Sequence, residues 1–338
     1  MKHLVSLALV PALVFGGVAV GARTATAACS KLDCGSNSPI IDMFSFHELN
    51  EVGLPNDAGL RLRDLVTSAN VHYHPDVIGG RLVGRDANQN IAIEHAALAG
   101  SYLEVFTAAG AFYKLYIDHV TLGVPFLVGP AASAGYESYE LNYTGGSITQ
   151  KTPVCSMPPR GATQQQKESV LYAGERFVAL TKRVRTAAVD DNNWFNVGCY
   201  NHVLWKTFVT RHTIPSSALG YSVPTSAHQA ILKMWVGDVC GNGNAFTTQG
   251  TPLYWNNPPF MWGSAVLGQD VLEGLWGPDG ALCINEYRKG DNFWTTVVVP
   301  GCGSTALPPL CSVAYPNLSL QNFPAAAYVF STIPQALP

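Results

Sequence analysis

The segment KMWVGDVCGNGNAFTTQGTPLYW, residues 233–255, places an acidic side chain and a cysteine beside a glycine-asparagine turn. Asp238 could serve as a general acid or base. With Asn242 and Asn244 it could also offer oxygen ligands to a cation, although no carboxylate completes a loop of EF-hand spacing. A third interpretation is structural: Asp238 accepts hydrogen bonds from the backbone of residues 239–241 in an Asx-type turn. We favour this structural interpretation.

Two other segments contain metal-ligand residues. His72-Tyr-His74 would place two imidazoles on one face of a strand, but zinc requires a third ligand that the sequence does not identify. Asp86-Ala-Asn88-Gln-Asn90 begins like an EF-hand loop and lacks its glycine and terminal glutamate. We interpret this second segment as the tip of a hairpin. The sequence therefore predicts neither a metal site nor a cofactor.

Hydrolytic chemistry has two further candidates. Ser133, in Ala-Ala-Ser-Ala-Gly, is the nearest match to a nucleophile elbow, but an alternating strand follows where the elbow requires a helix. His47 and Glu48 form a candidate acid–base pair. Adjacent residues rarely converge on one substrate atom, so we interpret this pair as the anchor of a local turn.

The tryptophans offer a binding hypothesis. All seven lie in the second half of the chain, and four of them stand among prolines and asparagines: Trp255, Trp262, Trp276 and Trp294. Aromatic rings with a polar edge can stack on a sugar or hold a peptide. Tryptophan is also an ordinary core residue of disulfide-rich domains. The sequence leaves both interpretations open, with carbohydrate or protein as the candidate ligand.

The first residues have the organisation of a secretory signal peptide. A basic start precedes an apolar run from Leu4 to Ala22, and Ala25-Thr-Ala27 matches a cleavage site. We predict cleavage after residue 27 and a secreted or periplasmic protein. Lipidation of Cys29 is the alternative, in a poor lipobox. No later stretch has the 18 or more apolar residues of a membrane span.

The mature chain carries a formal charge of −5, because Lys2 and Arg23 leave with the signal peptide. With 13% charged residues and this mild acidity, it is not typical of nucleic-acid-binding proteins. It also contains an even number of cysteines, which indicates a disulfide-bonded protein of an oxidising compartment. They are Cys29, Cys34, Cys155, Cys199, Cys240, Cys283, Cys302 and Cys311.

Sequence proximity gives a predicted pairing of these cysteines, because short loops close readily. We pair Cys155 with Cys199, which lies in the first predicted helix of the second half. Each of the other cysteines is paired with the next one along the chain. The predicted bonds are Cys29–Cys34, Cys155–Cys199, Cys240–Cys283 and Cys302–Cys311.

Several short alternating segments predict antiparallel strands in residues 28–150. The clearest is YLEVFTAAGAFYKLYIDHV, a hairpin that turns at Ala108-Ala-Gly110. Residues 151–168, rich in Pro, Gln and Thr, predict a linker. A second hairpin is predicted in SVLYAGERFVALTKRV, with its turn at Ala173-Gly174.

Two helices are predicted after the linker, at about 197–210 and 226–237. The second has Thr225 or Ser226 as N-cap and Gln229 to complete a capping box. Its buried stripe is Ala227, Ala230, Ile231, Met234 and Trp235, and it should end at Gly237. The predicted fold is mainly β to α+β. An antiparallel barrel or sandwich (28–150) precedes an irregular, disulfide-crosslinked α+β domain (169–338).

Short motifs across the mature chain resemble the ADYC-domain proteins, an exported bacterial family. The matching segments are Cys34–Pro39, Phe46–Asn50, Trp194–Asn196 with Cys199, Arg211–Thr213, Lys233–Trp235, Asp238 with Cys240 and Gly241, and Trp276–Ala281 with Cys283. The naming motif is degenerate: Gly237-Asp-Val-Cys240 keeps Asp and Cys but lacks the Tyr, which argues against a catalytic phenol there. The resemblance implies export and fold, and it brings no activity with it.

Two functions remain in view. The first is an extracytoplasmic binding or structural module without a cofactor. The alternative is an extracytoplasmic hydrolase that uses Asp238 or a histidine as general acid or base. An enzyme should place Asp238 at the rim of a deep pocket, whereas a binding module should align tryptophans on an exposed face.

Overall fold

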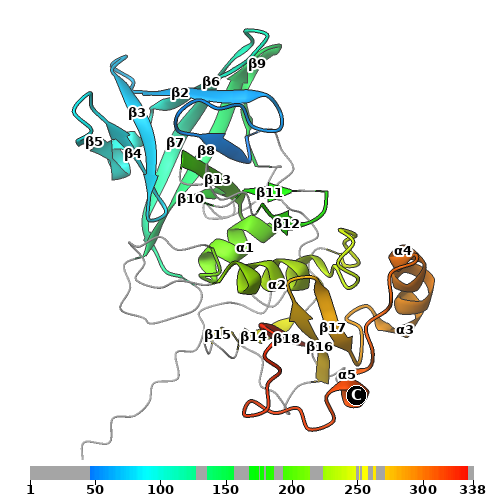
Figure 1. Cartoon of the computed structure of the whole chain (residues 1–338). Helices are drawn as coiled ribbons and strands as arrows, with labels where there is room; N and C mark the ends of the chain where they lie inside the picture. The colour runs from blue at the N-terminus through cyan, green and yellow to red at the C-terminus, as the bar shows by residue number, and fades with distance from the viewer. Residues whose placement is uncertain are drawn as a thin grey trace, which may run out of the picture.

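The computed structural model describes residues 46–126, 135–155, 167–174, 176–178, 180–185, 193–213, 224–248, 251, 253–257, 262–263 and 271–333. The predicted signal peptide, Cys29, Cys34 and Ser133 lie outside these residues. A large sheet and a smaller sheet enclose two helices, in three layers (Figure 1). The protein is mainly β, as predicted.

The large sheet has eleven antiparallel strands in the order β1-β13-β10-β8-β7-β6-β2-β3-β4-β5, and β9 pairs with β8. The strands are β1 (Glu48–Asn50), β2 (Leu60–Val66), β3 (His72–Ile78), β4 (Arg81–Arg85), β5 (Ile91–Glu94), β6 (Tyr102–Thr107), β7 (Phe112–Val124), β8 (Tyr136–Gly145), β9 (Ile148–Pro153), β10 (Ser169–Ala173) and β13 (Trp194–Cys199). A short 3-10 helix, η1 (His95–Leu98), connects β5 to β6.

Turn residues set the hairpins of this sheet. β6 and β7 form the predicted hairpin, in which Gly110 adopts a left-handed φ of 84° and donates to the carbonyl of Thr107. Asp86 closes the β4–β5 hairpin by accepting from the backbone N–H groups of Asn88 and Asn90. These bonds hold the pKa of Asp86 below its usual value. Both hairpin predictions are confirmed.

The large sheet curls over one apolar core. Side chains from most of its strands meet there, and the hydroxyl of Tyr139 on β8 accepts from the backbone N–H of Leu82 on β4. β1 and β5 are the two ends of the strand order, and within the described residues the sheet does not close into a barrel. The predicted barrel or sandwich is therefore a curled open sheet.

The predicted linker at 151–168 does not separate two sheets. β9 extends to Pro153, and β10 and β13, which follow the linker, pair with strands that precede it. The hairpin predicted at Ala173-Gly174 is wrong, because β10 pairs with β8 and β13 instead. The division into domains stays a prediction.

The hairpin in this region lies further along the chain. It joins β11 (Phe177–Val178) to β12 (Arg183–Val184). The side chain of Gln229 on the following helix holds it, with Oε1 accepting from the N–H of Val184 and Nε2 donating to the carbonyl of Lys182. Gln229 therefore does not complete the predicted capping box, and the helix starts after Pro224 without a side-chain cap.

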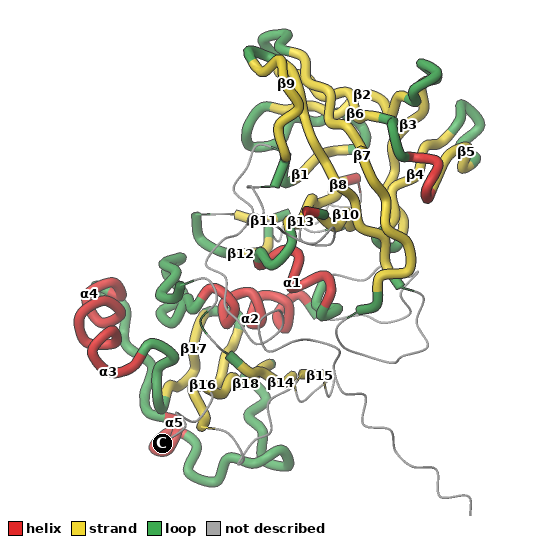
Figure 2. Tube along the Cα trace, turned by 180° about the vertical axis from the view of Figure 1, so that it is seen from behind, coloured by secondary structure: helices red, strands yellow, loops and turns green. Residues whose placement is uncertain are grey.

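The two helices are α1 (Val203–Val209) and α2 (Thr225–Val236), and they lie between the sheets (Figure 2). The helix predicted at 197–210 is therefore only partly correct, because 194–199 is strand β13. The predicted stripe of α2 is fully buried, and so are His228, Leu232 and Lys233. The burial is this wide because α2 contacts α1 and β12 as well as β16, β17 and β18.

The smaller sheet has the order β15-β14-β18-β16-β17. Its strands are β14 (Tyr254–Asn257), β15 (Trp262–Gly263), β16 (Val271–Gly277), β17 (Gly280–Ile284) and β18 (Val329–Ile333). Between β17 and β18 the chain makes a helical excursion with α3 (Gly290–Phe293), the π-helical turn η5 (Trp294–Val298), α4 (Val299–Cys302) and α5 (Cys311–Ala314).

Three disulfides connect these elements in the described part of the chain. Cys155–Cys199 is confirmed, with its Cα atoms 5.5 Å apart. The predicted pairs Cys240–Cys283 and Cys302–Cys311 are wrong, because the bonds are Cys240–Cys302 and Cys283–Cys311. The predicted pair Cys29–Cys34 lies outside the described residues and stays a prediction. Proximity in sequence did not decide the pairing. Cys283 and Cys311 meet because both are buried in the same apolar cluster with Leu275, Ala327 and Phe330.

Candidate functional site

The segment that suggested chemistry, residues 237–244, forms a corner at the end of α2, which we call the Asp238 corner. Gly237 adopts φ 67° and ψ 34° and stops the helix as predicted. The N–H of Gly237 donates to the carbonyl of Met234, and the N–H of Asp238 donates to that of Lys233. These two bonds define a Schellman motif.

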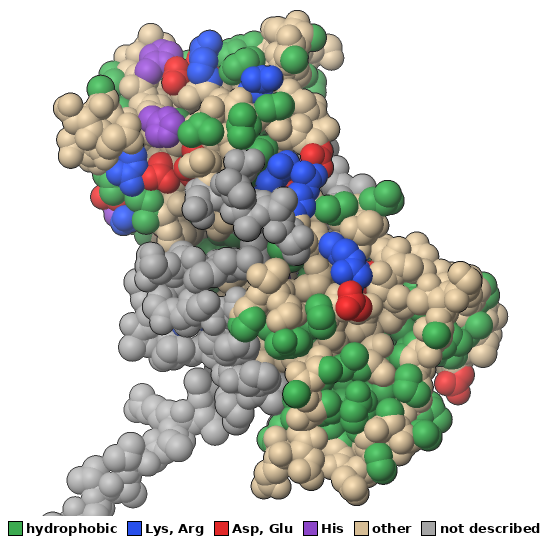
Figure 3. All heavy atoms as spheres, in the orientation of Figure 1, with side chains coloured by type: hydrophobic (Ala, Val, Ile, Leu, Met, Phe, Trp, Pro, Cys, Tyr) green, Lys and Arg blue, Asp and Glu red, His purple; other side chains and the backbone are tan. Residues whose placement is uncertain are grey.

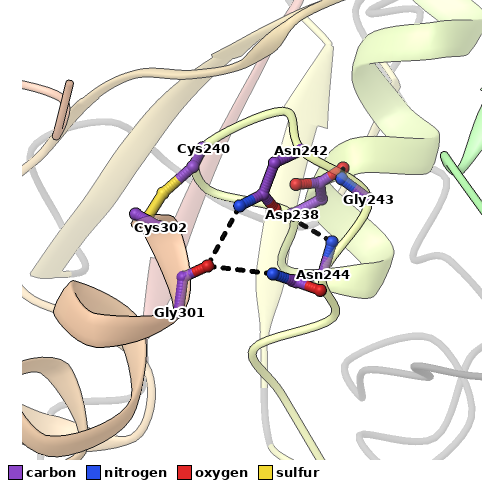
Figure 4. Close-up of a disulfide and its surroundings, with 7 residues drawn as sticks. All are labelled: Asp238, Cys240, Asn242, Gly243, Asn244, Gly301 and Cys302. Carbon is purple, nitrogen blue, oxygen red and sulfur yellow. Dashed lines mark hydrogen bonds between the residues drawn. A yellow bond between two sulfur atoms is a disulfide. The ribbon is translucent and has the colours of Figure 1, made fainter. Parts of the chain in front are cut away.

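The Schellman motif explains the position of the Asp238 carboxylate. It brings the side chains of residues 233 and 238 together, and an apolar contact usually fills this position. Here Lys233 Nζ donates to Asp238 Oδ2, and both side chains are fully buried. The same oxygen accepts from the N–H of Gly243 at 3.0 Å, and Lys233 also donates to the carbonyl of Thr181 at 2.9 Å (Figure 4 shows the corner).

Two glycines let other segments approach the corner closely. A Cβ on Gly241 would overlap the carbonyl oxygen of Asp279 in the β16–β17 turn, and one on Gly243 would meet the carbonyl of Leu180 at 2.5 Å. The amides of Asn242 and Asn244 both donate to the carbonyl of Gly301, next to the Cys240–Cys302 bond (Figure 4). The corner therefore joins α2, both neighbouring turns and the helical excursion.

This environment fits the structural interpretation of Asp238, which stays a prediction. The Asp238 carboxylate is not exposed to solvent and is paired with a buried ammonium. The hydrogen-bond partner is Gly243, not residues 239–241, so the detail of the predicted Asx turn is wrong. Burial lowers the pKa of Lys233, although the charge of Asp238 opposes that shift.

The Asp238 corner lies within a region that matches a known protein family. The family model described as the ADYC domain matches residues 95–290, which is more than half of the chain. The chain belongs to the ADYC-domain family. The match starts inside the large sheet and extends past the Asp238 corner to the start of α3, so it covers parts of both sheets and leaves out β1–β5 and β18. No curated protein and no solved structure matches this ADYC-domain chain.

The tryptophan side chains that the structure describes in this ADYC-domain protein do not form an exposed row. Trp255 and Trp276 are buried in the core, and nothing is described of the Trp262 side chain. Trp294 differs from these, because it is half-buried on η5 and lines a cavity of about 330 Å³. Of the four tryptophans considered for binding, Trp294 is the one that the described structure places at a cavity.

The Trp294 cavity combines aromatic, polar and aliphatic walls. Its lining residues are Ile284, Asn285, Tyr287, Asp291, Trp294, Leu307, Pro308 and Leu310. The rings of Tyr287 and Trp294 lie 5.5 Å apart, and the phenol of Tyr287 donates to the carbonyl of Phe246. Burial raises the pKa of Tyr287, so its hydroxyl stays protonated and oriented.

Covalent bonds and a buried ion pair fix the excursion that carries this cavity. Cys283–Cys311 ties α5 to β17, and Cys240–Cys302 ties α4 to the Asp238 corner. At its start, the guanidinium of Arg288 donates to both carboxylate oxygens of Glu273 and to the carbonyl of Met234 at the end of α2. Asn285, Tyr287 and Asp291 are the polar and aromatic lining residues that the sequence analysis missed; their signal was NEYRKGDNFW between two cysteines.

The remaining candidates have other environments. Glu48 is buried and ion-paired with Arg176 at 2.6 Å, so it anchors a segment distant in sequence and not a local turn. His72 lies 2.9 Å from Asp64 on the outer face of the large sheet. His212 is fully buried against Trp255, and desolvation lowers its pKa to about 3, which keeps it neutral.

The disulfides also bear on location. Disulfide bonds are rare in the reducing cytosol, so three of them suggest an extracytoplasmic protein. No helix in the described part of the chain is both long and apolar enough to cross a membrane.

Proposed function

We propose that this protein is an extracytoplasmic binding module that holds a carbohydrate in the Trp294 cavity. The supporting observation is the composition of the cavity wall, where an indole stands beside a carboxylate and an amide, Asp291 and Asn285. Sugars present apolar C–H faces that stack on aromatic rings and hydroxyls that bond to such polar groups. A volume of about 330 Å³ suits one or two sugar units, at the small end of ligand pockets.

The lining favours binding over hydrolysis. Glycoside hydrolysis ordinarily requires two carboxylates on opposite sides of the scissile bond. Asp291 is the one carboxylate among the described residues that line the cavity. Asp238, the acid of the hydrolase hypothesis, is buried in its pair with Lys233. We therefore propose a non-catalytic role, in a protein exported by cleavage of residues 1–27, with lipidation at Cys29 as the alternative to release.

Binding to a panel of immobilised neutral and amino-sugar oligosaccharides tests the proposal. The mature protein should bind at least one of them, and Trp294→Ala and Asp291→Asn should each weaken that binding by about tenfold or more, because each removes a direct contact. Phe112→Ala is the control, since Phe112 is an exposed aromatic on the distant large sheet. A folded protein that binds no oligosaccharide, or binds equally well without Trp294, would contradict the proposal.

A further inference from the structure

The outer face of the large sheet gathers four charged or ionisable side chains at a β-bulge. Leu62 pairs with Val105 and Leu65 with Leu103, so two residues of β2, Arg63 and Asp64, stand opposite Glu104 alone. Such a bulge turns side chains that would alternate onto one face. His72 on β3 completes the group, with Nδ1 2.9 Å from Asp64 Oδ2.

We propose that Asp64, His72 and Glu104 bind a divalent transition-metal ion of the zinc type. One ligand atom from each lies within 4.8 Å of the other two. Tetrahedral zinc with bonds of about 2.0–2.1 Å keeps its ligand atoms about 3.3 Å apart. The observed spacing therefore needs small side-chain rotations and no movement of the three strands. The sequence offered His72 and His74 without a third ligand; the fold supplies two carboxylates to His72.

Arg63 is the competitor for this site. Its guanidinium donates to Glu104 Oε2 and lies 3.6 Å from Asp64 Oδ2, so it neutralises the carboxylates that the metal would use. Its side chain is 53% exposed, whereas that of Glu104 is 7% exposed. Arg63 can therefore turn into solvent while Glu104 stays in place. Within the described residues Glu104 Oε1 accepts no hydrogen bond, which leaves that oxygen for the ion.

The donor set also indicates the class of ion and the state of the site. One imidazole with two carboxylates suits zinc and its first-row neighbours, while all-oxygen sites suit calcium and magnesium. Three protein ligands leave one tetrahedral position for water or a ligand. The group lies on the opposite sheet from the Trp294 cavity, so this site is independent of the proposed carbohydrate binding.

Titration calorimetry with zinc chloride tests the site, on the exported protein without a histidine tag. We expect one site per chain, and affinity about tenfold or more weaker in His72→Ala and Asp64→Asn, because each loses a ligand. Arg63→Gln should bind about fivefold more tightly, since the competing cation is gone. His119→Ala, which removes an exposed histidine of β7, should bind like the wild type.

Three results would overturn the proposal. They are wild-type affinity in His72→Ala, weaker binding in Arg63→Gln, and absence of binding in both the wild type and Arg63→Gln. Circular dichroism of each variant shows that it is folded, which is expected because His72 and Arg63 are exposed side chains. Cobalt absorption provides a second readout, since loss of the imidazole must change its spectrum.

Discussion

The two sheets keep their structures by different means. The large sheet consists mostly of alternating strands, many joined by hairpins, with one disulfide, Cys155–Cys199, one buried pair, Glu48–Arg176, and exposed ion pairs such as Lys151–Asp118. The smaller sheet and its helical excursion depend on two disulfides and two buried ion pairs, Lys233–Asp238 and Glu273–Arg288. Figure 3 shows the same division on one face: charged and histidine side chains gather over the large sheet, and apolar side chains over the C-terminal part.

This difference has a physical basis. A repeated strand pattern specifies its own neighbours, because each strand buries one face and pairs along its length. The excursion between β17 and β18 has short helices and no repeated pattern, so specific bonds must fix it. We therefore expect the smaller sheet to be sensitive to the loss of single buried groups, and the large sheet to tolerate loss of its surface pairs.

The largest effect should come from Glu273→Ala. It removes the carboxylate that pairs with the buried Arg288 guanidinium and that accepts from the hydroxyl of Ser331. Breaking one side of a buried pair typically costs about 3–5 kcal/mol of unfolding free energy. The matched control is Asp118→Asn, whose partner Lys151 is 49% exposed, with an expected loss below about 1 kcal/mol. Urea unfolding measures both variants. Similar losses of unfolding free energy in Glu273→Ala and Asp118→Asn would contradict the difference between the two sheets.

Removal of the Cys240–Cys302 bond should have the next largest effect. Replacing both cysteines by serine opens a 62-residue loop and should cost up to about 4 kcal/mol in the chain-entropy model. The loss should also loosen the Trp294 cavity, whereas removal of Cys155–Cys199 should lower stability and leave the cavity intact. Non-reducing peptide mapping checks the pairing itself. A Cys240–Cys283 crosslink would show that the observed connectivity is wrong.

A smaller effect is expected from Glu51→Gln, at the edge of the large sheet. Burial and the neighbouring Asp76 raise the pKa of Glu51 from 4.5 to about 8, while Arg85 pairs with Asp76 at 2.6 Å. Between pH 4.5 and 8 the folded protein therefore keeps a proton on Glu51 that the unfolded chain has already released. The unfolding free energy therefore falls as pH rises through that window. Glutamine should remove this slope and raise stability at pH 8 by about 1–2 kcal/mol.

Thermal unfolding at pH 5 and pH 8 measures the difference. The wild type should lose stability between the two values by more than the Glu51→Gln variant does. Equal losses in both proteins would show that Glu51 ionises normally in the folded state.

Elements whose apolar residues repeat at strand or helix spacing were predictable from the sequence. The β6–β7 hairpin followed from alternation around Gly110, and the buried stripe of α2 followed from apolar residues at helical spacing up to Gly237. The end of β13, residues 197–199, was misread as helix, because the strand shows no alternation: all of Trp194–Cys199 is buried between two other strands.

The contacts that shape the candidate site were less predictable. Lys233 and Asp238 meet through the Schellman geometry, which the glycine stop implied but the sequence reasoning did not use. The cysteine pairing depends on which elements share a core, and sequence separation does not report that. The Trp294 cavity is formed by residues 284–310, a segment whose path is fixed by its crosslinks and not by a local pattern.

The central claim is that Asp238 stabilises the fold while the Trp294 cavity binds the ligand. Asp238→Asn and Trp294→Ala, compared in thermal unfolding and in oligosaccharide binding, test it most directly. Asp238→Asn should lower the unfolding free energy by about 3 kcal/mol, and with it the thermal midpoint, because Lys233 stays buried without its counterion. Its affinity for the oligosaccharide should stay that of the wild type. Trp294→Ala should keep the wild-type thermal midpoint and weaken oligosaccharide binding. An unchanged midpoint in Asp238→Asn, together with lost binding or a lost activity, would contradict the account and return the chemistry to Asp238.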